Sequence, residues 1–376
     1  MKKVALVYDR VNKWGGAERV LLAIHEIFPK APLYTSVYDK KNAPWAKVFP
    51  KVHTSFLQKL PLARGNHEFL AILMPLAFES FDLSRYDLVI SVTSEFAKNI
   101  RVGPKTLHIC YCLTPTRYLF SHYDLYFQNP LLRAVSLPVV GYLRILDKLA
   151  STKVNKMIAI SGGVAKRIKK YYGRDSEIIF PPANTPLTQV SRMKKGKYFL
   201  IVSRLDFGYK KVDLAIKAFN KLGLPLVIVG TGREIERLKK ISKENIKFVG
   251  QVSEKELFDY YRGAKALIMP QEEDFGIVSI EAQSFGVPVI AYKKGGALDT
   301  VINGKTGVFF EKQNVGSLMR AVKKFARMKF RRKALTDNAK RFSKANFRKK
   351  ILGLIQRSSL RSHSSGRRRN APLAQK

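Results

Sequence analysis

Short apolar runs alternate with longer amphipathic stretches along almost the whole chain, and this alternation limits the possible folds more than any other feature. The runs at 86–94 and 106–114 are nearly continuous in apolar residues, which is typical of strands buried on both faces of a parallel sheet. Stretches with helical spacing of apolar residues lie between such runs, as at 17–28 and 212–222. The pattern predicts doubly wound α/β sheets.

The alternation occurs in two series, and 376 residues is long for a single core. We therefore expect two doubly wound domains, with a boundary within 183–196. In such sheets ligands bind beyond the carboxyl ends of the strands, so the active site is expected in a cleft between the domains. The predicted strands are 2–9, 31–39, 86–94, 106–114 and 155–161 in the first series, and 197–205, 225–232, 246–250, 266–270 and 288–292 in the second.

The chain is strongly basic, with 69 Lys and Arg against 28 Asp and Glu, a formal net charge of +41. The range 312–376 alone holds 21 basic residues and one acid, Asp337. The Ser/Arg-rich end, 356–376, lacks hydrophobic periodicity and is predicted to be a disordered tail. Such charge attracts nucleic acid or an anionic membrane. Because no RNA-binding motif, zinc spacing or helix-turn-helix signal is present, nucleic-acid binding is kept only as an alternative.

Neither a membrane span nor a secretion signal is expected. No apolar stretch is long enough to cross a bilayer, and the first apolar run stops at Asp9, too early for a signal-peptide core. We therefore expect a cytoplasmic protein. Cys110 and Cys112 lie on one face of a predicted strand and are interpreted as small buried hydrophobes rather than as a disulfide or metal site.

The segment QEEDFGIVSIEA, 271–282, sets carboxylates beside a glycine at the end of a predicted strand. Gly276 lets the backbone approach a ligand, and the first amides of a helix at 277–285 can bind phosphate. Glu273 and Glu281 would repel phosphate but accept hydrogen bonds from sugar hydroxyls. The combination predicts a nucleotide-sugar site. An acidic helix N-terminus favoured by the helix dipole explains the same residues equally well.

Cations for the diphosphate are predicted at Arg204, at a strand end, and at Lys210, just before a helix. They would neutralise a leaving diphosphate, although both could be ordinary surface cations. The sequence contains no Asp-x-Asp motif, so no metal is expected. Gly15 and Gly16, in a strand–turn–helix segment, can approach a phosphate or sugar. The segment lacks G-x-G-x-x-G, which disfavours a dinucleotide.

Taken together, residues 4–350 resemble the retaining GT-B glycosyltransferases of the family-4 type. The most specific element is the E-x7-E signature from Glu273 to Glu281. The resemblance implies an α/β fold of two Rossmann-like domains facing a central cleft: an acceptor-binding domain at 1–187 and a nucleotide-sugar-binding domain at 188–355, followed by the tail. Further similar segments are GGAERV (15–20), CLTPTRYLF (112–120), SRL and YKKVDLAI (203–216), IVGTGRE (228–234) and GVPVIAYKKGGALDTVINGKTGVFF (286–310).

The resemblance also implies residue roles. Glu273 would hold hydroxyls of the transferred sugar and Glu281 the ribose of the nucleotide, while Arg204 and Lys210 would clamp the diphosphate. No metal or cofactor is implied. The remaining implied contacts are the backbone amides of Phe275, Gly276 and Ile277, which would meet the donor phosphate and sugar, and Gly16, which would close over the donor phosphates.

One position departs from the family pattern. Many relatives carry a histidine where this chain has Leu113, so a mechanism that needs that imidazole is in doubt. Chemistry driven by leaving-group stabilisation and positioning fits better. His108 is expected to be packed within its strand. Thr114, Thr116 and Arg117 follow and are candidates for donor or acceptor contacts.

The segment TPTRYLF looks most like the members that use GDP-mannose in surface polysaccharide assembly, which favours GDP-mannose over a UDP-sugar. The stretches 56–78 and 129–149 are apolar with scattered Arg and Lys. Ordinary core helices explain them, but they could also enter the interface of an anionic membrane at its inner face and meet a lipid-linked glycan. The alternative enzyme is a nucleotide-sugar epimerase of the same fold, which Leu113 mildly disfavours.

Overall fold

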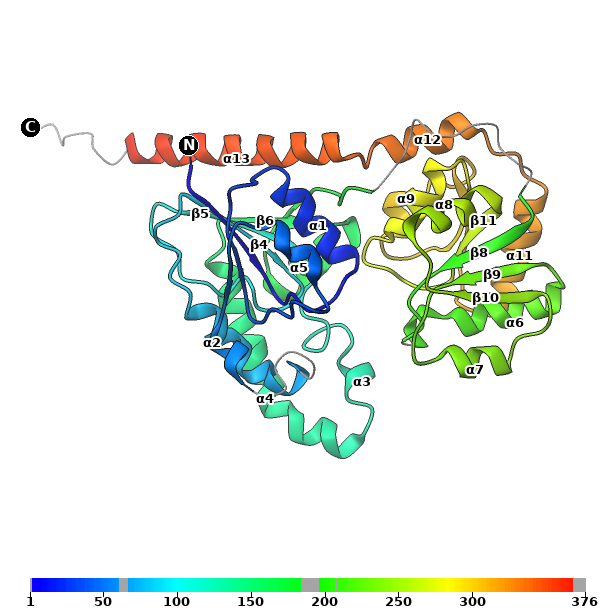
Figure 1. The fold of residues 1–376 in the computed structure, drawn as a ribbon, viewed down its shortest axis with the longest axis horizontal. Helices are drawn as coiled ribbons and strands as arrows, with labels where there is room; N and C mark the ends of the chain where they lie inside the picture. The colour runs from blue at the N-terminus through cyan, green and yellow to red at the C-terminus, as the bar shows by residue number, and fades with distance from the viewer. Residues whose placement is uncertain (1, 61–66, 184–195, 207, 368–376) are drawn as a thin grey trace, which may run out of the picture. The chain divides into compact units, whose positions relative to one another are not determined.

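The computed structural model describes residues 2–60, 67–183, 196–206 and 208–367. The chain divides into two compact units: unit 1 comprises Met1–Phe180 with Ala345–Lys376, and unit 2 comprises Pro181–Lys344. Each unit contains its own parallel sheet with helices on both faces (Figure 1). The predicted pair of doubly wound α/β sheets is therefore confirmed.

Unit 1 is built on a parallel sheet of order β3-β2-β1-β4-β5-β6-β7 among its described residues. The central pair β4 and β5 runs in register from Leu88 opposite Leu107 to Thr93 opposite Cys112. All six residues of β4 are buried, as expected for a strand covered on both faces. The strands are β1 Val4–Tyr8, β2 Leu33–Thr35, β3 Val52–Thr54, β4 Leu88–Thr93, β5 Leu107–Cys112, β6 Lys156–Ala159 and β7 Glu177–Ile178.

Helices cover this sheet, and the last of them comes from the far end of the chain. α13, Lys344–Arg367, places Phe347, Ile351 and Leu354 in buried positions, with the Phe347 ring 5.9 Å from that of Tyr111 on β5. The other helices are α1 Gly16–His25, α2 Met74–Glu79, α3 Tyr123–Tyr126, α4 Pro130–Thr152 and α5 Gly162–Tyr172, with 3-10 turns η1 Pro44–Val48, η2 Phe56–Lys59 and η3 His67–Leu73.

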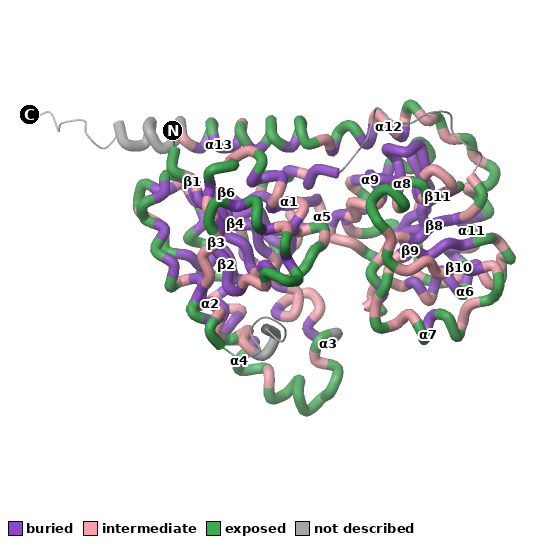
Figure 2. Tube along the Cα trace, in the orientation of Figure 1, coloured by how far each residue is buried: buried purple, intermediate pink, exposed green. Residues whose placement is uncertain are grey.

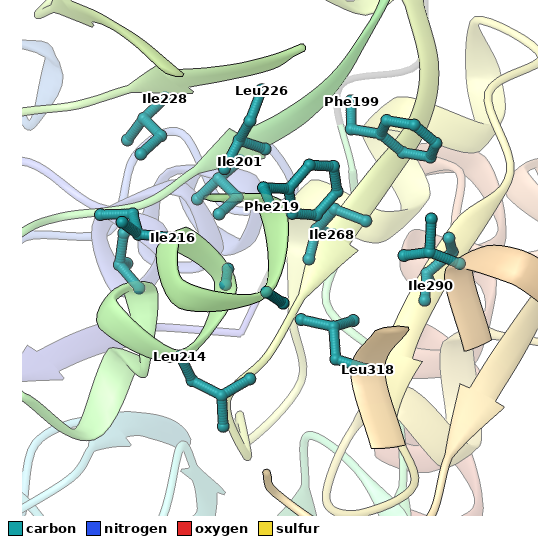
Figure 3. Packing of buried hydrophobic residues seen from close by; sticks show 14 of the residues in the cluster. Phe199, Ile201, Leu214, Ile216, Phe219, Leu226, Ile228, Ile268, Ile290 and Leu318 are labelled. Carbon is teal, nitrogen blue, oxygen red and sulfur yellow. The ribbon is translucent and has the colours of Figure 1, made fainter. Parts of the chain in front are cut away.

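Unit 2 repeats the arrangement with the strand order β10-β9-β8-β11-β12-β13, the order of a classic dinucleotide-type sheet. Phe199 and Ile201 of β8 pack against Ile216 and Phe219 of α6 in its core (Figure 3). The strands are β8 Tyr198–Val202, β9 Leu226–Val229, β10 Ile246–Gly250, β11 Ala264–Met269, β12 Val289–Tyr292 and β13 Gly307–Phe310. The helices are η4 Gly208–Lys210, α6 Val212–Leu222, α7 Ile235–Lys240, α8 Glu254–Gly263, α9 Ile277–Ser284, α10 Ala297–Thr300, α11 Val315–Ala326 and α12 Arg332–Lys340.

The unit boundaries differ from those expected at 187 and 355. The chain leaves unit 1 after Phe180 and returns to it at Ala345. The tail predicted to be disordered from 356 continues α13 as far as Arg367, because a helix anchored at Phe347 propagates at little cost per added residue. Residues 368–376 lie outside the described residues. The acceptor and donor roles of the units, and a cleft between them, stay predictions.

Candidate active site

The loops that leave neighbouring strands of unit 2 lie against one another at the carboxyl edge of the sheet. Gly230 and Gly232, directly after β9, have positive φ angles of 137° and 158°. A Cβ atom on Gly230 would lie 1.9 Å from the carbonyl oxygen of Ser203, which follows β8. Only glycine fits such an approach. The two loops are therefore held together by backbone contact.

An ion pair joins two of the predicted site residues across this edge. Lys210 Nζ lies 2.5 Å from Glu273 Oε1, linking the loop after β8 to the loop after β11. Gln271 Nε2 donates to the same carboxylate oxygen over 2.9 Å. The Lys210 and Glu273 side chains are only 13% and 19% exposed. Within the described residues Glu273 Oε2 has no hydrogen-bond partner, so it can accept a hydrogen bond from a ligand hydroxyl.

Arg204 lies in the same loop as Lys210 but does not contact Glu273. The residue lies two positions after the end of β8 and is exposed. Its side chain makes no hydrogen bond or ion pair with the residues that the structure describes. Of the two residues predicted to clamp the phosphate, Lys210 lies at the Glu273 carboxylate, whereas Arg204 does not. The role of Arg204 stays a prediction.

The acidic loop is held in shape by a glycine pair that the sequence analysis did not single out. Gly296 N–H donates to the carbonyl oxygen of Glu273 over 2.8 Å. A Cβ on Gly296 would lie 2.3 Å from Phe275 Cα, and one on Gly295 would lie 2.3 Å from the Glu273 carbonyl oxygen. The sequence signal that could have indicated this close approach is the pair of adjacent glycines before a short helical segment.

The helix predicted at 277–285 is present as α9, Ile277–Ser284. Gly276 caps the helix with φ 82°, in the left-handed region that favours glycine. The Phe275 side chain is buried, with its ring 5.6 Å from that of Phe342. Only the backbone at Phe275 can therefore meet a ligand. The predicted contacts of the Phe275, Gly276 and Ile277 amides concern the backbone and stay predictions.

The second glutamate of the signature has a different environment. Glu281 on α9 is 3% exposed, and its Oε2 accepts a hydrogen bond of 2.9 Å from Tyr261 Oη. The Tyr261 ring stacks on Phe285 with centroids 5.7 Å apart. Tyr261 thus fixes the direction of the carboxylate. The sequence analysis did not identify it, because α8 and α9 meet only in the tertiary structure.

In unit 1 the corresponding sheet edge carries Gly16 at the first position of α1. Among the described residues outside its own helix backbone and chain neighbours, none has an atom within 4 Å of a Cβ placed on Gly16. These surroundings therefore do not require glycine here. Beside it, Asp9 after β1 is buried and accepts hydrogen bonds from Thr93 Oγ1 at 2.7 Å and from the Ser94 amide at 2.7 Å. The edge of unit 1 is thus rigid, while the space beside Gly16 is open.

Two further ion pairs lie beyond Asp9. Arg10 pairs with Glu95; burial works to lower the pKa of Arg10, but the carboxylates of Glu95 and Asp9 raise it above its usual value. Lys98 Nζ lies 2.5 Å from Asp147 Oδ1, with both side chains almost fully buried. Neither pair was predicted, because their members are far apart in the sequence.

No group of three or more His, Cys, Asp or Glu side chains in the described ranges could hold a metal ion. Among the same residues, no helix is long and apolar enough to cross a membrane.

Comparison with known proteins relates part of the chain to one family. Residues 187–342 match the family described as glycosyl transferases group 1, a range that includes Arg204, Lys210, Glu273 and Glu281. This match lies within unit 2 and covers less than half of the chain.

The curated relatives of this chain are distant. An uncharacterized glycosyltransferase of Methanocaldococcus jannaschii is 26% identical over 218 residues, 56% of this chain and 61% of the relative. One of Haemophilus influenzae is 24% identical over 330 residues, 84% of this chain and 87% of the relative. A GDP-mannose-dependent alpha-(1-6)-phosphatidylinositol monomannoside mannosyltransferase of Mycobacterium tuberculosis is 32% identical over 160 residues, 38% of this chain and 41% of the relative. The chain therefore spans less than two thirds of the first and third of these proteins.

Solved structures show the GT-B fold. Sucrose-phosphate synthase of Thermosynechococcus elongatus superposes with a TM-score of 0.71 at 17% identity, covering 95% of this chain and 99% of the other. The complex of Anabaena HepE with UDP and glucose gives 0.65 at 18% identity, covering 95% and 100%. The galactosyltransferase WaaB of the lipopolysaccharide outer core gives 0.66 at 18% identity, covering 94% and 98%.

Several polar residues on β5 and in the segment after it make contacts within the fold. His108 is buried and bonded to Ser91 Oγ over 2.9 Å, which confirms the prediction of a packed strand histidine; burial lowers its pKa to about 3. Thr116, a predicted ligand contact, is fully buried and donates to Asp147 over 3.4 Å. Thr114 Oγ1 is buried without a partner among the described residues. Thr114 and Arg117 stay candidates for ligand contact.

The two cysteines of the chain follow the sequence prediction. Cys110 and Cys112 are free and buried on β5. Burial raises the pKa of Cys110 to about 11, which keeps its thiol protonated. Both side chains therefore act as small hydrophobes in the core of unit 1.

Proposed function

We propose that the chain transfers a hexose from a nucleotide-sugar to a hydroxyl group of a glycan, with retention of configuration at the anomeric carbon. The bond from the anomeric carbon to the diphosphate breaks, and a bond from that carbon to the acceptor oxygen forms. The acceptor proton passes to the departing phosphate oxygen. The observation that carries the proposal is the Lys210–Glu273 pair at the carboxyl edge of unit 2.

This pair suits a ligand that joins an anion to hydroxyl groups. Lys210 stabilises the negative charge that develops on the leaving diphosphate, and Glu273 Oε2 accepts a hydrogen bond from the transferred sugar. In the free enzyme each side chain neutralises the other over 2.5 Å. Arg204, exposed next to this edge, would supply the second cation. Glu281, oriented by Tyr261, would accept from the ribose.

The proposed donor is GDP-mannose. The mycobacterial relative, named as GDP-mannose-dependent, supports this choice. The HepE structure, which shares the fold, was solved with UDP and glucose, so a UDP-sugar is the competing outcome of the test below. No metal or cofactor takes part in the proposed step.

The proposed acceptor is a lipid-linked glycan, in cell-surface polysaccharide biosynthesis. The same mycobacterial relative is named for a phosphatidylinositol mannoside, a sugar acceptor on a lipid. An acceptor of this kind would bring the chain to the inner face of an anionic membrane. The net charge of +41 suits such a surface.

The donor is identified by thermal shift with GDP, UDP, ADP and their sugars, because a ligand that binds only the folded state raises the melting temperature. GDP and GDP-mannose should give the largest shifts. Donor incubated with and without a glycan acceptor then separates a transferase from an epimerase, since only an epimerase converts the donor alone.

The site is tested with Glu273→Ala and Glu281→Ala. We expect Glu273→Ala to lower turnover by about 100-fold, within the range seen when a transition-state contact is removed. Glu281→Ala should chiefly weaken donor binding. Glu311→Ala is the matched control, because Glu311 also pairs with a lysine, over 2.8 Å, but on the exposed surface. Wild-type transfer rates in both site variants would show that the assignment is wrong.

A further inference from the structure

Helix α4 presents a continuous stripe of large apolar side chains to solvent. The stripe residues are separated by four, seven, three and four positions, which places them on one face of the helix. These residues are Leu131 (73% exposed), Val135 (68%), Tyr142 (54%), Ile145 (59%) and Leu149 (52%). Single exposed apolar residues are common, but a contiguous exposed row marks an interaction surface.

The orientation of this stripe is fixed by the opposite face of α4. Val140 and Leu143 are buried in the core of unit 1. Asp147 accepts from Lys98 Nζ at 2.5 Å and from Tyr172 Oη at 2.6 Å. Rotating the helix to bury the stripe would expose these apolar side chains and break both polar contacts. The stripe is thus a permanent feature of the folded unit.

The first turns of α4 are exposed on almost every side. Leu132, Leu137 and Val139 lie off the stripe and are 62%, 51% and 40% exposed. Figure 2 shows this part of α4 as exposed, in contrast to the buried strands of the sheet. A helical segment that is apolar in several directions suits immersion in lipid better than contact with one face of a protein.

Other exposed apolar side chains belong to the same region of unit 1. Ile72 on η3 is 47% exposed and Leu76 on α2 is 56% exposed. The buried residues of these segments pack into the same core cluster as α4, through Met74, Phe78 and Val140. Figure 1 shows α2, α3 and α4 at one end of the unit. The apolar surface therefore extends beyond one helix.

Charge indicates an anionic occupant rather than a second copy of the chain. Between 130 and 146, α4 carries Arg133 and Arg144 and no acidic residue. Arg133 pairs with Asp124, and Arg144 donates to the carbonyl oxygen of Leu119. The cation beside the stripe is therefore Lys148, which is exposed one position before Leu149. Long basic side chains beside an apolar face can reach lipid phosphates. A second copy of a +41 chain would instead be repelled.

We propose that α4 is the membrane-docking element of this protein. Its apolar stripe, from Leu131 to Leu149, lies in the headgroup region of an anionic bilayer, parallel to the surface. The proposal deepens the proposed function by assigning the lipid side of the acceptor to unit 1. The docking itself can be measured without donor or acceptor.

The test is sedimentation with vesicles of phosphatidylcholine containing one third phosphatidylglycerol, and with vesicles of phosphatidylcholine alone. We expect binding to the anionic vesicles, weakened about tenfold or more by Val135→Glu, because a charge in the stripe opposes insertion. Val48→Glu is the matched control. Val48 lies on η1 of the same unit and is 56% exposed, and its substitution should leave vesicle binding unchanged.

Insertion can also be observed directly. A cysteine at Val135, labelled with an environment-sensitive fluorophore, should shift its emission to the blue when anionic vesicles are added, whereas a label at Val48→Cys should not. Cys110 and Cys112 are buried and will not react in the folded protein. The molar mass of wild type and of Val135→Glu, each measured without lipid, shows whether the stripe instead joins two copies of the chain.

Three results would overturn the docking proposal. They are vesicle binding by Val135→Glu at the wild-type level, no blue shift at position 135, or a wild-type dimer that Val135→Glu converts to a monomer. The last would make the stripe a protein interface. If donor binding fails while vesicle binding persists, the proposed reaction is wrong and the docking stands. If donor binding persists while vesicle binding fails, only the docking is wrong.

Discussion

At the scale of single residues, the two glutamates of the E-x7-E signature differ more than their spacing suggests. Glu273 is partly exposed and pairs with Lys210, while Glu281 is buried and bonded to Tyr261. The first can exchange partners when a ligand arrives, because its pair joins two loops at the sheet edge. The second is held in one orientation. This difference supports separate roles, one in the reaction and one in donor binding.

The predicted ligand contact at Gly16 can be separated from a structural role of glycine. Gly16→Ala should leave the melting temperature unchanged or slightly higher. The added Cβ clashes with none of the residues that the structure describes, and alanine favours a helix by about 0.5–1 kcal/mol. It should weaken donor binding if the donor phosphates lie against this position. Thermal shift with and without donor measures both effects.

Gly296→Ala is the contrasting variant. Its Cβ would lie 2.3 Å from Phe275 Cα, so the acidic loop must move, at a cost of about 1–3 kcal/mol of overpacking. Stability should fall along with activity. Equal stability of the two variants would contradict the glycine contacts described for the acidic loop.

His108 predicts a stability that depends on pH. Burial lowers its pKa to about 3 in the folded state, against about 6.5 in an unfolded chain. Below about pH 6.5 the unfolded chain therefore binds a proton that the folded chain excludes. Stability from this group is complete above that pH and falls by about 1.4 kcal/mol per pH unit as the pH drops toward 3.

The measurement is urea unfolding of wild type and His108→Gln between pH 8 and pH 4. The variant should be less stable at pH 8, because the bond to Ser91 is altered. Below about pH 6.5, its free energy of unfolding should fall less steeply than that of wild type, by about 1.4 kcal/mol per pH unit. Parallel stability curves for the two proteins would mean that the fold does not lower the pKa of His108.

Predictions for single residues succeeded where the local sequence pattern alone determines the environment of the residue. The buried cysteines and the packed strand histidine, His108, follow from local patterns. Gln271, Tyr261 and the contacts of Gly296 do not, because each depends on which loops meet in space. Thr116 was expected at the ligand and is bonded to Asp147 instead, a partner 31 residues away.

At the scale of elements, α4 is anchored by a buried ion pair and not only by apolar contacts. Lys98, after β4, reaches Asp147 on α4, which also accepts from Tyr172 on α5. Burial raises the pKa of Asp147, although Lys98 opposes the shift. The pair therefore ties α4 to the loop after β4 and to α5.

Removing one partner should destabilise unit 1 strongly. Lys98→Met should lower the free energy of unfolding by about 3–5 kcal/mol, because it leaves a buried carboxylate without its cation. Adding Asp147→Asn removes that charge while keeping a hydrogen-bond acceptor for Tyr172. The double variant should recover most of the loss in urea titrations. A double variant no more stable than Lys98→Met would show that the charge pair is not the source of the effect.

Sequence patterns predicted elements best where burial was complete. The strands at 86–94 and 106–114 were identified because both faces are apolar. β3, β7 and β13 were missed because they are short and lie at the sheet edges; both residues of β7 are exposed. For the stretch 129–149 the sequence pattern did not decide between a core helix and a helix in the membrane interface. In the structure, one half of α4 packs on the core and the other half is exposed. Periodicity cannot separate these cases.

At the scale of the whole molecule, the chain enters unit 2 once and returns to unit 1 for its last helix. The sequence analysis expected the second unit to continue to 355, because nothing in the amphipathic pattern of α13 says which sheet it covers. Phe347, Ile351 and Leu354 are buried, and Phe347 contacts Tyr111 of β5. The last helix is thus a structural part of the first unit.

This return makes the stability of unit 1 depend on residues more than 200 positions away along the chain. Phe347→Ala should destabilise unit 1 by about 3–5 kcal/mol, because it leaves a cavity beside Tyr111. Leu352→Ala on the same helix is the control, since Leu352 is 39% exposed and its loss should change little. The two tryptophans of the chain, Trp14 and Trp45, both lie in unit 1. Tryptophan fluorescence therefore follows the unfolding of that unit alone.

We expect donor binding to report chiefly on the other unit, because three of the predicted donor contacts, Lys210, Glu273 and Glu281, lie in unit 2. In Phe347→Ala the tryptophan transition should move to lower urea concentration, while the donor affinity at low urea stays at the wild-type value. If the tryptophan transition is unchanged, α13 does not stabilise the sheet of unit 1. If Leu352→Ala moves the tryptophan transition equally, the loss of stability comes from a change in helix propensity and not from core packing.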